Sequence, residues 1–229
     1  MKILTRLFIF LLLVGGMAAC QNTPDASLST PSPEADGQAK NYPLFKSSLV
    51  GQVQDGVLSV QDGENSPRVL IDDRQVTDMG WFLEGEQVAY TAVAANNYQL
   101  GIVDVATGEQ TLLQTFTEPV SAPHPSRDGR YLSILVGTGE THDCVVDLRL
   151  LILVLDEERQ IADTYTITDF AGIPADAATT LYPVTDGYWI YDTILSVSLQ
   201  PMCEENGAIA SGYALNADLQ QATPLRDEP

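Results

Sequence analysis

The sequence predicts an all-β domain built from repeated antiparallel sheets. From Tyr42 onward, segments rich in β-branched and aromatic residues alternate with short polar turns, and no amphipathic helix of ordinary length appears. Two kinds of turn also recur at related spacings along the chain. Regular recurrence of this kind is typical of a repeat architecture rather than of a single irregular sheet.

The first recurring turn is an acidic residue followed by glycine, and it occurs at Glu84-Gly85, Asp128-Gly129 and Asp186-Gly187. Each is followed by an apolar segment that we expect to be the next strand. Gly85 and Gly129 are 44 positions apart, which matches one four-stranded propeller blade. The step from Gly129 to Gly187 is 58 positions, so we expect an insertion between about 137 and 149.

The second recurring turn follows the aliphatic end of a strand. It occupies residues 105–109, 155–159 and 215–218, with a further copy upstream at 60–64. About 45 residues per repeat allow four blades at most. The fold class is therefore an antiparallel repeat domain, a small or incomplete β-propeller of about four blades. A generic antiparallel sandwich with similar hairpins is the alternative.

These turns resemble the TolB-type, WD-like β-propeller repeats of bacterial envelope proteins. That pattern reads Pro-x-Trp-Ser-Pro-Asp-Gly, then a strand, then Asp-x-x-Thr-Gly-Glu. The second repeat keeps six of these residues, and the third repeat keeps four but has Pro125 at the tryptophan position. The matching residues are Trp81, Gly85, Asp104, Thr107, Gly108 and Glu109 in the second repeat, and Pro123, Ser126, Asp128 and Gly129 in the third. The resemblance covers roughly residues 45–222, and the fourth repeat keeps little beyond Asp186-Gly187.

The N-terminus has the pattern of a signal peptide over residues 1–19. Lys2 and Arg6 precede an apolar run at 7–14 that is too short for a permanent membrane span. Residues 17–20 resemble a lipobox, in which Cys20 becomes acylated, although Met17 replaces the usual leucine. Ordinary secretion with a free Cys20 is the alternative. We expect residues 20–41 to be the lipidated cysteine with a disordered tether, and residues 42–229 to be the propeller-like domain.

The expected location is therefore extracytoplasmic, with the protein anchored by lipid to a bacterial membrane. Gln21 after the lipidated cysteine resembles the pattern of export to the outer membrane in diderm bacteria. With a single membrane, the anchor is the outer face of the cell membrane.

Strands can be placed along the domain in order. Asp55-Gly56 and Asp62-Gly63 predict hairpin turns in the first repeat, which lacks an expected strand before Phe45. Residues 150–155 are apolar on both faces, which favours a strand buried between two sheets. A short helical turn fits best within 169–180, and the last repeat spans about 181–222. Whether four blades close a ring alone or with a partner stays open.

The composition is strongly acidic, with a formal net charge of −20. Such a surface repels nucleic acid and anionic lipid headgroups, so no nucleic-acid partner is expected. The acidic clusters lack the spacing of a calcium loop, and no zinc signature, phosphate loop or nucleophile elbow is present. We therefore predict no cofactor, no metal and no catalytic residue.

Cys144 and Cys203 each follow their repeat's acidic-Gly turn by a similar distance, 15 and 16 positions. This places both in the connection between the second and third strands of adjacent blades. In an oxidising envelope compartment we expect them to form a disulfide. The alternative is a Cys-His site, because His142, Asp143 and Cys144 are consecutive.

The function that the sequence favours is a non-catalytic binding or scaffold lipoprotein that recognises a protein or an envelope polymer. The alternative is a carbohydrate-binding protein or hydrolase that uses a cleft near Trp189, His124 or His142. Aromatic residues at 182, 188, 189 and 191 suit sugar stacking, although packing in the core and against a neighbouring blade is the favoured explanation for aromatic residues that alternate along one strand. The ligand-binding residues cannot be assigned from the sequence.

Overall fold

Strands fill the chain from Lys40 to Pro224 in the computed structural model. It describes residues 39–45, 47–82, 85–142, 145–174, 177, 181–183, 187–202 and 211–225, all within the unit Ala35–Pro229. One helical element lies entirely within these ranges, the 3-10 turn η1 (Ile167–Asp169). The structure is therefore all-β and antiparallel, which confirms the predicted fold class.

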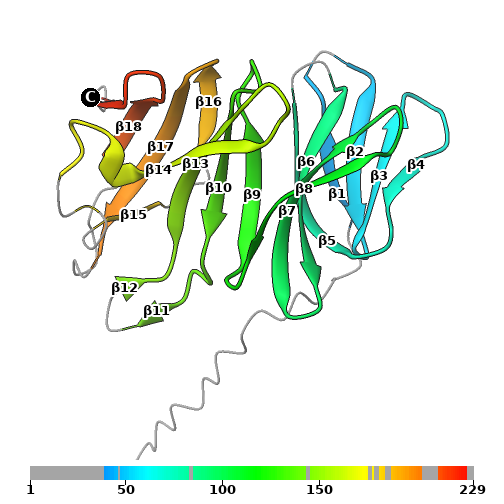
Figure 1. Ribbon diagram of the computed structural model, residues 1–229, viewed down its shortest axis with the longest axis horizontal. Coiled ribbons are helices and arrows are strands. Elements are labelled where there is room, and N and C mark those ends of the chain that lie inside the picture. The colour runs from blue at the N-terminus through cyan, green and yellow to red at the C-terminus, as the bar shows by residue number, and fades with distance from the viewer. Residues whose placement is uncertain are drawn as a thin grey trace, which may run out of the picture. The chain divides into compact units, whose positions relative to one another are not determined.

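The first two sheets are each made of four strands that are consecutive in the chain. We call the four main sheets blades 1 to 4 in chain order (Figure 1). Blade 1 consists of β1 (Lys40–Pro43), β2 (Leu49–Gln54), β3 (Val57–Asp62) and β4 (Arg68–Ile71). Blade 2 consists of β5 (Gln75–Trp81), β6 (Gln87–Ala94), β7 (Asn97–Asp104) and β8 (Gln110–Phe116). The opening strand β1 lies before Phe45, so the expectation that no strand precedes that residue was wrong.

Blades 3 and 4 follow the same order with one addition each. Blade 3 consists of β9 (Val120–Pro125), β10 (Tyr131–Val136), β13 (Arg149–Leu155) and β14 (Ile161–Thr166). Between its second and third strands lies a separate hairpin of β11 (Thr141–His142) and β12 (Val145–Val146). Blade 4 consists of β15 (Leu181–Pro183), β16 (Tyr188–Tyr191), β17 (Ile194–Pro201), β18 (Ser211–Asn216) and β19 (Gln221–Pro224).

The expected insertion between about 137 and 149 is the β11–β12 hairpin. The proposed alignment of blade 4, however, was wrong. Both β15 and β16 pair with β17, so together they form one interrupted first strand. Gly187 lies between β15 and β16, and the turn into the second strand is Asp192-Thr193 instead. The strand after Asp186-Gly187 is therefore not the second strand of its blade.

Three apolar cores each join two neighbouring blades. The core between blades 1 and 2 includes Leu58 and Tyr90, and the core between blades 2 and 3 includes Leu100 and Leu132. The third core, between blades 3 and 4, includes Leu195. The described residues form no such core between blade 4 and blade 1.

Blades 2 and 3 are apolar on both faces because each contributes to two cores. In β13, Ile152 packs toward blade 4 and the adjacent Leu153 packs toward blade 2. A strand buried on both faces needs an unbroken apolar run, since neighbouring side chains point in opposite directions. This confirms that the apolar run at 150–155 is a strand between two sheets.

Blades 1 and 4 are apolar on one face only. In blade 1, Val53 and Leu58 face the core, whereas Gln52 and its cross-strand partner Ser59 lie on the opposite face. That outer face is mostly polar and consists of Val50, Gln52, Gln54, Val57, Ser59 and Gln61. Blade 4 similarly carries Ser198 and Gln200 opposite its core residues. Polar outer faces are what terminal repeats need in order to meet water.

Candidate functional site

One position is equivalent in the first strand of every blade. The strand register pairs each of these residues with the start of the second strand, as Pro43 with Val50, Trp81 with Val88, Pro125 with Leu132 and Trp189 with Leu195. We call Pro43, Trp81, Pro125 and Trp189 the corner residues. Pro125 thus does occupy the tryptophan position of blade 3. The true counterpart of that position in blade 4 is Trp189, three residues before Asp192.

The four corner residues line a common cavity of about 650 Å³. This volume falls within the range of about 300–1,000 Å³ that is usual for ligand pockets. The other lining residues are Leu44, Phe45, Phe82, His124, Ser126, Arg127, Tyr188 and Ile190. The first strands of all four blades therefore meet at one candidate binding site.

Both tryptophans at the cavity are held by the blade that precedes their own. The indole N–H of Trp81 donates a hydrogen bond of 2.6 Å to the carbonyl oxygen of Tyr42. The indole N–H of Trp189 donates one of 2.7 Å to the carbonyl oxygen of His124. Each acceptor is the residue just before a corner residue, so the same contact occurs twice. These bonds hold the half-buried indole rings, since an indole N–H group that is removed from water requires a partner.

Trp189 is further supported from one side by Tyr131. The two rings stack with centroids 5.7 Å apart and an interplanar angle of 23°. The Tyr131 hydroxyl donates a hydrogen bond to Asp218, in the turn between β18 and β19. Asp218 also forms an ion pair of 3.1 Å with Arg130. A chain of contacts thus connects the cavity wall to the outer turn of blade 4.

These contacts shift the titration of the groups involved. The Tyr131 hydroxyl, together with Arg130, holds the pKa of Asp218 below its usual value. Burial and the hydrogen bond to Asp218 raise the pKa of Tyr131. Burial acts to raise the pKa of Asp128, but hydrogen bonds from Arg130 and Ser126 outweigh it and lower that pKa. The carboxylates nearest this wall are therefore charged at neutral pH and already bonded.

Arg127 differs from the other cationic side chains of the described residues. Lys40 and the remaining described arginines each donate a hydrogen bond to a carbonyl oxygen or pair with a carboxylate. The Arg127 guanidinium, by contrast, makes no hydrogen bond or ion pair with the described residues. In so acidic a chain, an arginine at a cavity without a carboxylate partner is unusual.

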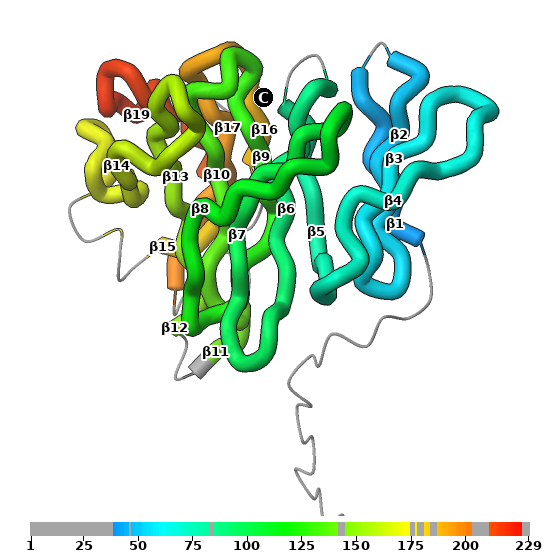
Figure 2. Tube along the Cα trace, turned by 45° about the vertical axis from the view of Figure 1, so that its right-hand side comes forward, coloured from blue at the N-terminus to red at the C-terminus, as the bar shows by residue number. Residues whose placement is uncertain are grey.

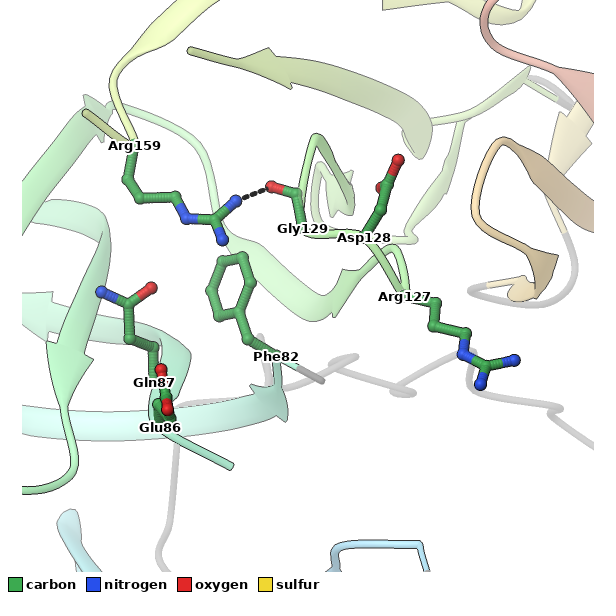
Figure 3. Close-up of a pocket in the computed structure, with 7 residues that line it drawn as sticks. All are labelled: Phe82, Glu86, Gln87, Arg127, Asp128, Gly129 and Arg159. Atoms are coloured by element: carbon green, nitrogen blue, oxygen red, sulfur yellow. Dashed lines mark hydrogen bonds between the residues drawn. The ribbon is translucent and has the colours of Figure 1, made fainter. Parts of the chain in front are cut away.

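A second cavity of about 210 Å³ adjoins the first, and the two share Phe82 and Arg127 (Figure 3). Arg159 lies over the Phe82 ring, with its guanidinium carbon 5.0 Å from the ring centroid, and donates to the carbonyl oxygen of Gly129. Figure 3 shows the Arg127 side chain extending away from this contact. Arg159 is thus committed to joining blades 2 and 3, and Arg127 is left at the cavity.

Of the residues that the sequence singled out, the structure brings His124 and Trp189 into the same cavity. Tyr188, which is 64% exposed, also lines this cavity, whereas Tyr182 and Tyr191 do not line it. His142 belongs to the hairpin β11–β12, at the opposite end of blade 3 from β16 (Figures 1 and 2). Cys20, Cys144 and Cys203 lie outside the described residues, and so does Asp143.

Sequence reasoning missed Arg127 and the Tyr131–Asp218 contact. The signal that could have found the site is a tryptophan three residues before an acidic residue. It occurs at Trp81 and Glu84, and again at Trp189 and Asp192. The second occurrence was missed because Thr193, and not a glycine, follows Asp192. Nothing local in the sequence distinguishes Arg127 from the other arginines, since a missing partner is a property of the folded chain.

Within the described ranges, no three His, Cys, Asp or Glu side chains are grouped so that they could hold a metal ion. The same part of the chain contains no helix with the length and apolar character that a membrane span requires.

Comparison with solved structures shows that the fold is a TolB-like β-propeller fold. The chain is similar to an oligogalacturonate lyase from Vibrio parahaemolyticus, with a TM-score of 0.61 and 13% identity over 82% of this chain and 53% of that one. A putative TolB from Agrobacterium tumefaciens matches with a TM-score of 0.53 and 12% identity over 77% and 60% of the two chains. The β-propeller domain of the Trilobed protease from Pyrococcus furiosus matches with a TM-score of 0.55 and 11% identity over 83% and 58%.

This chain therefore spans only a little more than half the length of each of these structures. No protein-family model matches the sequence. No curated protein matches it either. At identities this low, the resemblance defines the class of fold and leaves the function to be argued from the site.

Proposed function

We propose that the protein is a non-catalytic binding module that holds its ligand in the 650 Å³ cavity. The observation that carries this proposal is the lining itself. Fixed tryptophans, exposed aromatic and aliphatic side chains and an unpaired guanidinium surround one opening. Pockets that combine apolar walls with a few convergent polar groups are the usual sites of ligand binding.

The chemistry of the lining supports binding rather than catalysis. Hydrolases of glycosidic bonds use paired carboxylates, and acyl hydrolases use a nucleophile aligned with a base. None of the described lining residues is a carboxylate. The neighbouring Asp128 is bonded to Ser126 and Arg130, which leaves it poorly placed to transfer protons.

We further propose that the module is displayed on the outside of a bacterial membrane. Cys20 would carry the acyl chains, and the following residues would tether the domain to the bilayer. Its partner would be a protein or an envelope polymer. The similar structures include a putative TolB as well as a lyase and the propeller domain of a protease, so the fold is compatible with binding and with catalysis.

The proposal is tested by photo-crosslinking in intact cells. A photoreactive phenylalanine analogue at Tyr188 should capture a reproducible partner, whereas the same analogue at Leu112 should not. Leu112 is the matched control because it is also exposed, at 48%, but lies outside the cavity. The double variant Phe45→Ser/Tyr188→Ser should lose the partner, and Val69→Ser/Leu112→Ser should keep it. Equal capture at both positions would show that the cavity is not the binding site.

The second candidate, a carbohydrate-binding protein or hydrolase, is favoured by one observation. Trp189 and His124 line the same cavity, as a sugar platform beside a titratable group would require. Binding and hydrolysis are separated by the variant His124→Ala. Turnover of a glycan or ester that stops in this variant would replace the binding module with an enzyme.

A further inference from the structure

We propose that the cavity binds a polysaccharide that carries carboxylates at intervals, with Arg127 holding a carboxylate and the aromatic rim stacking against the sugar rings. This inference rests on the binding function proposed above and names its ligand class. It starts from the charge around Arg127. The chain has 31 acidic and 11 basic residues, yet this guanidinium has no carboxylate partner among the described residues.

A guanidinium matches a carboxylate because its planar N–H groups can donate two parallel hydrogen bonds. All five N–H donors of Arg127 remain available, since no described residue accepts from them. The lining of the 650 Å³ cavity holds no carboxylate that would compete for this position. The two carboxylates that line the adjoining cavity, Glu86 and Asp128, form no ion pair with Arg127. The ligand is therefore expected to bring the anion.

The rim favours rings rather than flexible aliphatic chains. Tyr188 and Phe45 are 64% and 83% exposed at the cavity, and the two tryptophans are held in place by their N–H bonds. A sugar ring has one face of C–H groups, which loses contact with water when it lies on an aromatic side chain. Aromatic side chains whose orientation is already fixed lose little conformational entropy on binding.

The cavity also suits the interior of a long chain. The described residues form cores between blades 1 and 2, 2 and 3, and 3 and 4, but none that joins blade 4 to blade 1. Phe45 of blade 1 and Tyr188 of blade 4 nevertheless line the same cavity. A polymer can enter between these two blades without threading an end through a closed ring.

The net charge of the protein limits how densely the polymer can be charged. Each added carboxylate is repelled by the acidic surface, and this repulsion is screened only beyond about 8 Å at physiological ionic strength. One arginine at the cavity offsets one anion. A chain with one carboxylate for every two sugars is therefore expected to bind better than a chain with a carboxylate on every sugar.

Isothermal titration of the purified protein with three defined probes tests the inference. Hyaluronan oligosaccharides carry one carboxylate per two rings, their carboxyl-reduced form carries none, and oligogalacturonate carries one per ring. We expect hyaluronan to bind most tightly. Arg127→Gln should weaken that binding by about tenfold, as for the loss of a charge-assisted hydrogen bond. Arg127→Lys should restore part of it.

The matched control is Arg149→Gln, which removes the same charge from an exposed arginine outside the cavity that pairs with Glu118. Its hyaluronan affinity should stay within about twofold of the wild type, since Arg149 does not line the cavity and its exposed ion pair contributes little to the stability of the fold. Equal binding of the reduced form would overturn the role of Arg127, and tightest binding of oligogalacturonate would overturn the spaced-carboxylate requirement. No binding of any glycan, together with a protein captured at Tyr188, would overturn the ligand class but leave the binding module intact. Failure of both the titrations and the crosslinking would reject both proposals.

Discussion

The carboxylate of Asp78 accepts a hydrogen bond of 2.6 Å from the hydroxyl of Tyr42, which connects blade 2 to blade 1. The same carboxylate accepts a bond of 3.0 Å from the backbone N–H of Ala122 in blade 3. One side chain thus joins the first strands of three blades. Burial, together with the adjacent carboxylate, raises the pKa of the Tyr42 hydroxyl, so Tyr42 stays a donor throughout the physiological range.

Removing parts of this contact should lower stability in a graded way. Tyr42→Phe removes one bond to a charged group and should cost about 1–2 kcal/mol, while Asp78→Ala should cost about 3 kcal/mol because the Ala122 N–H loses its acceptor. Urea denaturation measures both free energies of unfolding. Tyr98→Phe is the control, because its hydroxyl makes no hydrogen bond with the described residues. A loss in the control as large as that in Tyr42→Phe would contradict the assignment.

Gly80→Ala should separate blades 2 and 3. A Cβ atom at Gly80 would lie 1.8 Å from the carbonyl oxygen of Pro123, and backbone atoms cannot move aside as a flexible side chain does. We expect a loss of about 3 kcal/mol or more, at or above the upper end for overpacking. Gly212→Ala is the control, since its nearest neighbour is a Leu225 side-chain atom at 3.2 Å. Thermal unfolding compares the two, and equal melting temperatures would refute the close contact.

The contact between blades 3 and 4 should weaken in acid. The pKa of Asp218 is lowered in the folded protein, so its stabilising effect is fully present above its unfolded pKa of about 4 and is lost as the pH falls through the folded pKa. Asp218→Asn should therefore be less stable than the wild type at pH 7, and the gap should close toward pH 2. Melting temperatures across this range show the effect. Asp72→Asn serves as the control for removal of a carboxylate, because the Asp72 carboxylate makes no hydrogen bond or ion pair with the described residues.

The Cys144–Cys203 disulfide stays a prediction. A bridge that closes a loop of 59 residues contributes roughly 4 kcal/mol in the chain-entropy model. Non-reducing mass spectrometry of the exported protein should find the linked peptides, and the double variant Cys144→Ser/Cys203→Ser should melt at a lower temperature. Two free thiols in the exported protein would rule the bridge out.

Lipidation at Cys20 is tested by metabolic labelling with a fatty-acid analogue. The wild type should carry the label and fractionate with membranes, and Cys20→Ala should do neither. Cys203→Ser is the control, because it removes a cysteine outside the proposed lipidation site, and it should keep the label. Labelling of Cys20→Ala at the wild-type level would end the anchoring hypothesis.

The sequence predicted the turns that are stabilised within a few residues. Asp104 accepts bonds from the N–H and hydroxyl of Thr107, and Asn216 accepts one from the N–H of Leu219. Because these bonds are local, the turn after the third strand could be aligned correctly in all four blades. The burial of β13 on both faces could also be predicted, since it depends only on an unbroken apolar run in the sequence.

Features that depend on distant residues could not be predicted in the same way. In blade 4, Gly187 lies between β15 and β16, and only the pairing of both strands with β17 shows that the turn is at Asp192-Thr193. The unpaired state of Arg127 likewise depends on which carboxylates the fold brings near it. The cavity itself exists only where the four corner residues meet, so no single repeat contains it.

The polar outer face of blade 1 disfavours the docking of a further sheet on it. A fifth sheet docked there would bury Gln52 and Ser59, which lie on the polar outer face of blade 1. Buried amide and hydroxyl groups without partners cost free energy, so added repeats would first need apolar substitutions on that face. Docking of a further sheet on this face would therefore depend on a few side chains of β2 and β3.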